Sequence, residues 1–177
     1  MARGKQFCPK MVNSRPELPL ILGNHLYTLH ARSCIVSHHD LSLSEGDQLV
    51  STHNILPVER IDLENRQPPF TFAAALNFHE PSSTLIATSR FVKEQPTDSV
   101  AFFGIGANGE ILSESVLQPK RGKEFRGVGL IGNHYLVAGQ HDGWLSCFEW
   151  KGDTTGWIEQ ELDAPVQYEK VVDMEAM

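Results

Sequence analysis

The sequence repeats one layout three times along its 177 residues, and this repetition limits its possible folds more than any other feature does. Each repeat opens with a short apolar strand and continues through a polar loop into a second strand. A turn rich in Gly, Asp, Asn or Ser then leads to a third strand that ends near a proline. The three repeats cover residues 25–57, 84–119 and 134–165.

Strand patterning and turn chemistry agree with this layout. Apolar and polar residues alternate over 144–150, which is the period of a strand. Turn residues occupy 45–47, 107–109 and 151–153, as hairpins require. A further strand is expected ahead of the second repeat at 71–76 and ahead of the third at 126–131. Four short strands per unit of about 40–60 residues describe a β-propeller blade.

We therefore predict an all-β chain made of three to four four-stranded antiparallel propeller blades. The expected blades are 14–57, 70–119 and 125–166, followed by a C-terminal tail at 167–177, within one partial propeller domain at 1–177. Val58 to Arg66 could form one or two helical turns before Pro68 and Pro69 end them. Closed propellers have typically four to eight blades, so three cannot close a ring alone. The chain is therefore expected to be a fragment lacking N-terminal blades, to pair with another chain such as a second copy, or to leave strand edges open.

Composition excludes several classes of protein. The net charge is -7 and the pI is near 5.6, whereas a general nucleic-acid binder needs a basic face. No apolar run reaches the length of about 18 residues that a membrane helix needs, and the first residues lack a signal-peptide core. The three cysteines (Cys8, Cys34 and Cys147) are far apart, which predicts reduced thiols and a cytoplasmic location.

One segment matches a nucleotide-binding motif by sequence alone. Gly104, Gly106 and Gly109 form a GxGxxG pattern, but that fingerprint needs a following helix. Residues 110–116 instead have the pattern of a strand. We expect a hairpin turn here rather than a phosphate loop.

The histidines and tryptophans have structural explanations that we prefer to functional ones. His38 and His39 are adjacent, so on a strand they point to opposite faces and cannot bind one metal ion together. Trp144, Trp150 and Trp157 are expected in the core between blades rather than in a stacking platform for a ligand. No metal site and no cofactor are predicted.

Three arginines are the candidate site residues. Arg15 precedes the first repeat, Arg90 ends a strand in the second, and Arg126 begins the strand ahead of the third. The innermost strands of a propeller line its central channel, so such residues could converge there on one carboxylate or phosphate. Alternatively, each arginine is a surface charge or is paired with one of the surplus acids.

Several of these segments resemble the seven-bladed lactonase propellers, the family of bacterial 6-phosphogluconolactonases and fungal carboxymuconate cyclases. The resembling stretches are NHLYTLHA at 24–31, LIATSR at 85–90, AGQHDGWLSCFEWK at 138–151, and Ser14-Arg15-Pro16. The resemblance covers residues 14 to 166 and implies the C-terminal part of such a propeller.

The resemblance also implies roles for individual residues. Arg15 and Arg90 fall on the family's two catalytic arginines, and Arg126 has a substrate-binding counterpart. The family's glutamate position holds Ala31, whose side chain cannot transfer a proton, and its histidine would lie upstream of Met1. The implied function is lactone formation or hydrolysis on a small anionic acid. The alternative is a non-catalytic propeller fragment or scaffold that acts through protein interaction.

Overall fold

The computed structural model describes residues 16–56, 72–90, 95–140, 143–152 and 156–160. Within these ranges the chain forms three four-stranded antiparallel sheets and one short 3-10 helix, η1 (Glu80–Ser82). The first sheet contains β1 (Pro16–Leu22), β2 (His25–His30), β3 (Ile35–Asp40) and β4 (Leu49–Asn54). The second contains β5 (Phe72–His79), β6 (Thr84–Arg90), β7 (Val100–Ile105) and β8 (Ile111–Leu117). The third contains β9 (Phe125–Ile131), β10 (His134–Gly139), β11 (Leu145–Trp150) and β12 (Trp157–Gln160).

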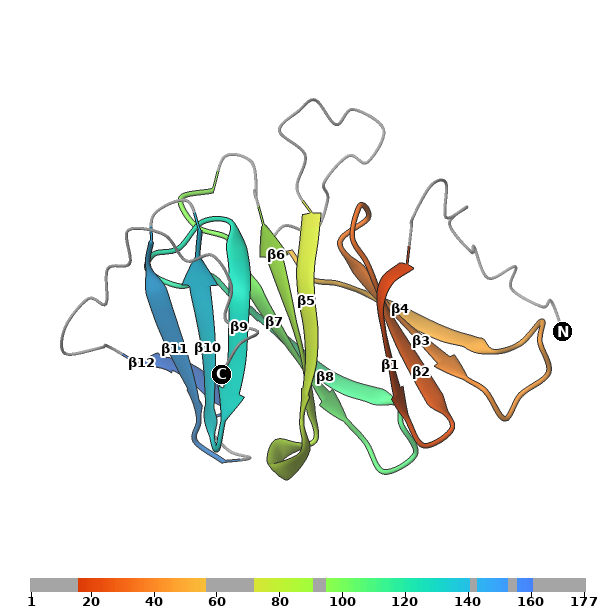
Figure 1. Cartoon of the computed structure of the whole chain (residues 1–177). Helices are drawn as coiled ribbons and strands as arrows, with labels where there is room; N and C mark the ends of the chain where they lie inside the picture. Colours follow the sequence, from red (N-terminus) through yellow and green to blue (C-terminus); the bar gives the residue numbers. More distant parts are fainter. Residues whose placement is uncertain (1–15, 57–71, 91–94, 141–142, 153–155, 161–177) are drawn as a thin grey trace, which may run out of the picture.

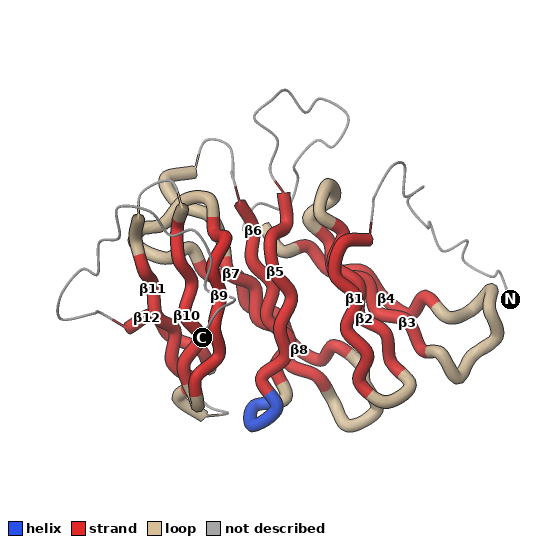
Figure 2. The backbone as a smooth tube through the Cα atoms, in the orientation of Figure 1, coloured by secondary structure: helices blue, strands red, loops and turns tan. Residues whose placement is uncertain are grey.

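Each sheet is a meander in which strands adjacent in sequence are also adjacent in space. The first strands of neighbouring sheets lie against each other, β1 against β5 and β5 against β9, while the remaining strands fan outward (Figures 1 and 2). This is the arrangement of propeller blades around a channel. The all-β class and the four-stranded blades predicted from the repeats are confirmed, and three blades are described. No described segment forms a helix long and apolar enough to cross a bilayer.

The second blade is packed on both faces, because successive strand residues point to opposite sides of a sheet. Leu85 and Phe103 face the first blade, whereas their neighbours Ile86 and Phe102 face the third. The core between the first two blades also contains Tyr27, Leu29, Cys34, Val36, Ile55, Leu56, Ala73, Ala87 and Ala101. The core between the second and third also contains Val100, Phe125, Tyr135, Val137, Phe148 and Trp157. Each fully buried large apolar side chain contributes about 1.5–3 kcal/mol to folding.

The tryptophan prediction is confirmed for Trp157 and, in part, for Trp150. Trp157 stacks on Phe102 of the neighbouring blade at 5.2 Å between ring centroids, and Trp150 packs beside it. Trp144 differs, because its ring lies 4.2 Å below the guanidinium of Arg121 instead of in the core. Trp144 comes directly before β11, and Arg121 lies in the loop between β8 and β9.

The glycine motif at 104–109 is a hairpin turn, as predicted. Gly106 and Gly109 each donate a backbone hydrogen bond within the turn, to Glu110 and Gly106 respectively. Gly109 has a φ of +77°, a conformation that glycine adopts without steric cost. Strand β8 follows directly, so no helix is available to bind a phosphate.

The helical turns predicted at 58–66 lie outside the described residues.

Candidate functional site

The innermost strands β1, β5 and β9 all begin at one edge of the arc of blades, the upper edge in Figure 1, which we call the channel edge. Arg90 is the last residue of β6 and pairs with Phe72, the first residue of β5. Arg126 is the second residue of β9, which packs against both β5 and β6. The fold therefore carries Arg90 and Arg126 to the same edge. Arg15 lies outside the described residues.

Arg90 ends the second strand of its blade, one position out from the innermost strand. Its guanidinium carbon lies 5.5 Å from the centre of the Phe72 ring, within range of a cation–π interaction. The side chain is half-buried. The Phe72 ring thus packs against one side of the Arg90 guanidinium at the channel edge.

The backbone beneath Arg90 is fixed by buried serines. Ser89 and Ser99 share a hydrogen bond between their hydroxyl oxygens at 2.7 Å, and Ser99 also donates to the carbonyl oxygen of Ile55 at 2.9 Å. Ile55 follows the last strand of the first blade. These contacts join two blades at the channel edge and hold the end of β6 in place.

Arg126 is engaged in an ion pair. Its Nε and Nη2 donate to the same oxygen of Glu124, Oε1, at 3.2 and 2.8 Å. The Arg126 side chain is 45% exposed and the Glu124 side chain 16% exposed. The prediction that an arginine could be paired with a surplus acid therefore describes Arg126.

The backbone of Glu124 is fixed by hydrogen bonds to two other segments of the chain. Its φ of +59° is in the left-handed region, which is uncommon for a residue with a side chain. Its N–H donates to the buried carboxylate of Asp98, and its carbonyl oxygen accepts from the N–H of Gln140 at 3.0 Å. Sequence reasoning missed Asp98 and Glu124, since neither belongs to a recognised motif and both act through contacts between distant segments.

Ala31 lies next to the start of β5, where its carbonyl oxygen accepts the N–H of Ala73 at 2.8 Å. The residue is buried and its methyl group has no proton to transfer. This position therefore offers no acid or base at the channel edge.

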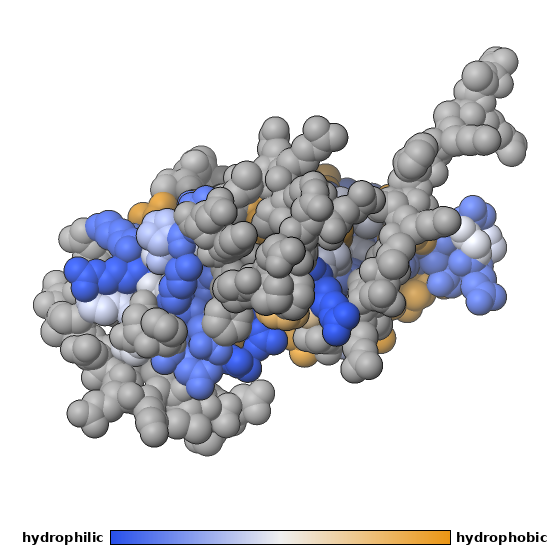
Figure 3. Space-filling view, turned by 90° about the horizontal axis from the view of Figure 1, so that it is seen from above, coloured by the Kyte–Doolittle hydropathy of each residue, from blue (hydrophilic) through white to orange (hydrophobic). Residues whose placement is uncertain are grey.

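Figure 3 looks down on the channel edge. Among the described residues visible in this view, hydrophilic ones cover much of the third-blade side, and a smaller group lies at the far end of the first blade. Arg126 belongs to β9 of the third blade, and Glu124 comes directly before that strand.

The histidines form hydrogen-bonded pairs on both faces of the first sheet. His38 Nε2 lies 3.2 Å from His25 Nδ1, on the face toward the second blade, where the His38 ring stacks on Tyr27. On the opposite face, the Ser37 hydroxyl joins His30 and His39 at 2.8 and 3.0 Å. His38 and His39 thus point to opposite sides, as the strand period requires. No group of three metal-ligating side chains occurs among the described residues.

Burial lowers the pKa of His30, His38 and His39 below the usual value of 6.5, because a charged imidazole loses hydration there. Neighbouring imidazoles act in the same direction on His30 and His38.

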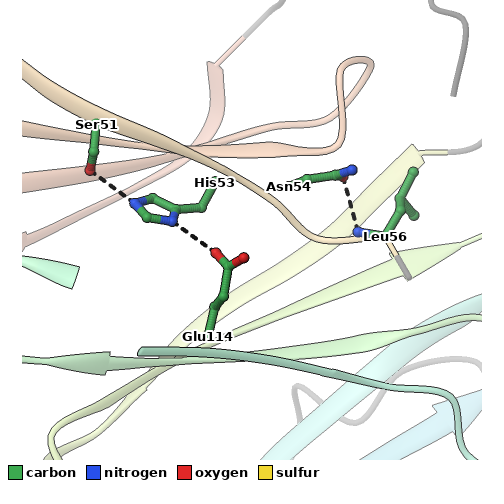
Figure 4. Close-up of polar contacts among 5 residues, drawn as sticks. All are labelled: Ser51, His53, Asn54, Leu56 and Glu114. Carbon is green, nitrogen blue, oxygen red and sulfur yellow. Dashed lines mark hydrogen bonds and ion pairs between the residues drawn. The ribbon is translucent and has the colours of Figure 1, made fainter. Parts of the chain in front are cut away.

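His53 joins the first two blades at their outer strands, 3.0 Å from Glu114 on β8 and 3.0 Å from Ser51 (Figure 4). Asn54 then accepts the N–H of Leu56 and shapes the end of β4 (Figure 4). These contacts are structural.

Comparisons with known proteins agree with the arc of blades. No family profile and no curated protein sequence matches the chain. Solved structures do match. The periplasmic gluconolactonase PpgL of Pseudomonas aeruginosa aligns with a TM-score of 0.66 at 18% identity, over 87% of this chain and 40% of that one. The chain has the fold of part of that β-propeller.

Two further structures support the same fold. They are proteins provisionally assigned as 6-phosphogluconolactonases, from Bacteroides fragilis and Bacteroides uniformis. The TM-scores are 0.61 and 0.55, the identities 17% and 18%, and the alignments cover 85% and 81% of this chain. They cover 38% and 39% of those chains, so this chain spans about two fifths of the length of the proteins that it matches.

Proposed function

We propose that this partial lactonase propeller binds a small organic anion at the channel edge and acts in lactone chemistry. The observation that supports this most is that Arg90 and Arg126 lie at one edge, beside the first residues of the innermost strands. A guanidinium is planar and always charged, and it binds carboxylates and phosphates through paired hydrogen bonds. Arg90, together with Arg15, would anchor the anionic group in the reaction, and Arg126 would contact the rest of the substrate.

The finer assignment follows the sequence resemblance. The ligand would be a sugar-acid lactone or a carboxymuconate-like acid, and the reaction would be lactone hydrolysis or cyclisation, without a cofactor. Both reactions need a group that moves a proton. Ala31 cannot do so, and in this proposal a different residue supplies that group.

Arginine substitutions test the binding site. Arg90→Ala and Arg15→Ala are each expected to weaken binding of 6-phosphogluconate or 3-carboxymuconate at least tenfold by calorimetry, because each removes a charged partner. Lys151→Ala is the matched control, since Lys151 pairs with Glu149 where β11 ends, away from the channel edge. Unchanged affinity in both arginine variants would contradict the proposal.

The second candidate is a non-catalytic scaffold. One observation favours it, namely Ala31 at the position where the family resemblance implies a glutamate. Ala31→Glu separates the two candidates, and turnover in that variant would argue against a scaffold. Because Ala31 is buried, folding of the variant must be verified by circular dichroism.

Partners and location are also proposals. The open faces of the first and third blades would be covered by further blades or by a second copy of the chain, because closure is what protects strand edges. A homodimer predicts a native mass near twice 19.8 kDa, and a clean monomer would exclude it. We retain the cytoplasmic location on the cysteines, since Cys34 and Cys147 are buried thiols.

A further inference from the structure

The ion pair between Arg126 and Glu124 changes what the channel edge can bind. The two side chains together carry no net charge, so Arg126 does not act as an isolated cation. Two of the three side-chain nitrogens of Arg126, Nε and Nη2, donate to Glu124 Oε1. Among the bonds between described residues, Glu124 Oε2 and Arg126 Nη1 take no part. The pair therefore still offers an acceptor oxygen, Glu124 Oε2, and a donor nitrogen, Arg126 Nη1, to a ligand.

The structure holds this pair in place from several directions. The backbone of Glu124 keeps a left-handed conformation, which is unfavourable for a residue with a side chain unless surrounding contacts hold it. The hydrogen bonds to Asp98 and from Gln140 sustain it on either side. Asp98 belongs to the loop before β7 and Gln140 to the end of β10, so two separate segments position Glu124.

We propose that Glu124 is a specificity-determining residue of the channel edge. Its carboxylate pairs with Arg126 and neutralises the positive charge there. This part of the edge therefore binds hydroxyl groups rather than a second anionic group. A hydroxyl can donate to the carboxylate and accept from the guanidinium, which suits a polyhydroxylated acid with one anionic group. A second carboxylate placed here would meet the like charge of Glu124. This inference rests on the proposed anion binding through Arg90.

Other cations near the pair do not alter the comparison between variants. Arg121 lies in the loop before β9 and is stacked on Trp144. Any charge that it contributes is the same in the wild-type protein and in a Glu124 variant. The ratio of the affinities for two ligands, compared between the wild-type protein and a Glu124 variant, thus isolates the effect of Glu124.

Two small probes test the proposal by calorimetry: gluconate, a polyhydroxylated monocarboxylate, and tricarballylate, a tricarboxylate without hydroxyls. The wild-type protein is expected to prefer gluconate. Glu124→Gln should shift the affinity ratio at least tenfold toward tricarballylate, because it frees the charge of Arg126 while keeping a side chain of equal size. Adding Arg126→Gln to that variant should abolish the shift.

The matched control is Glu114→Gln, which also removes a carboxylate paired with a cation, but on the outermost strand β8. It should leave the ratio unchanged. If Glu124→Gln fails to fold, Arg126→Gln alone should weaken tricarballylate binding more than gluconate binding, because Glu124 then stands as a net negative charge.

The outcomes separate this inference from the proposed function. Suppose that both probes bind and that Arg90→Ala weakens the binding of both. If the ratio of their affinities is then the same in Glu124→Gln as in the wild type, the role of Glu124 is overturned and the anion site stands. If neither probe binds the wild-type protein or Glu124→Gln, both proposals are overturned.

Discussion

The hydroxyl group of Tyr27 on β2 donates a hydrogen bond to the carbonyl oxygen of Gly109, in the turn between β7 and β8. The two residues are 82 positions apart in the sequence, and their bond is one of several that join the first blade to the second. Tyr27 is fully buried, and burial raises its pKa to about 12, so the phenol remains a donor at any physiological pH. Together with the apolar core that they share, this bond packs the first blade against the second.

Tyr27→Phe should lower the free energy of unfolding by about 1–2 kcal/mol, because it leaves the turn carbonyl without this donor. The measurement is urea denaturation at pH 7.5. Tyr135→Phe is the control, since the Tyr135 hydroxyl only accepts a longer bond of 3.3 Å from Asn77. An equal loss in both variants would contradict a special role for the Tyr27 bond.

Gly109→Ala should destabilise the protein by more than about 2 kcal/mol, from two causes. The residue has a positive φ, and a Cβ would lie 2.2 Å from the ring of His25. Gly132→Ala separates the causes, because Gly132 has a φ of +56° with no atom within 4 Å of such a Cβ. That control should cost about 1 kcal/mol. Similar losses in both variants would show that packing against His25 is unimportant.

Stability should fall as the pH is lowered from 7.5 to 5.5. The folded-state pKa of His30, His38 and His39 lies below the unfolded value of 6.5, so the unfolded chain binds more protons in this range. Their contribution is complete above pH 6.5 and is lost below it. Urea denaturation at several pH values measures the slope.

His38→Gln should reduce this slope, because it removes one titrating group from the interface between the first two blades. The charged or titratable neighbours of His38 are His25, His39, Asp40 and His53. His134→Gln is the control, since His134 is exposed at the start of β10. A slope that is the same in His38→Gln and the wild type would contradict the assignment.

Phe102→Ala should cost about 3–5 kcal/mol, since it removes a ring that packs against Phe148 and Trp157 of the third blade. Leu112→Ala on the exposed side of β8 is the control, with a side chain that is 68% exposed, and should change stability by less than about 0.5 kcal/mol. Loss of the third blade alone would appear as a separate early transition in denaturation.

Local patterns in the sequence were enough to predict the strands and turns. Alternating residues in 144–150 and turn residues at 107–109 specify strands and hairpins through short-range geometry alone. The repeat of four strands then indicated a blade, and the structure confirms three such sheets. Arg90 was expected at the end of a strand, which is also local information.

The candidate site depends on contacts that local patterns do not contain. The pairing of Arg126 with Glu124 could be recognised only once the conformation of Glu124 was known, because an exposed arginine two residues from an acid is common. Asp98 holds that conformation from 26 positions away. The sequence by itself determined the all-β blades, since strand period and turn chemistry are properties of neighbouring residues. Only the tertiary structure decided which arginines share an edge and which of them is already paired, because these depend on how separate blades pack.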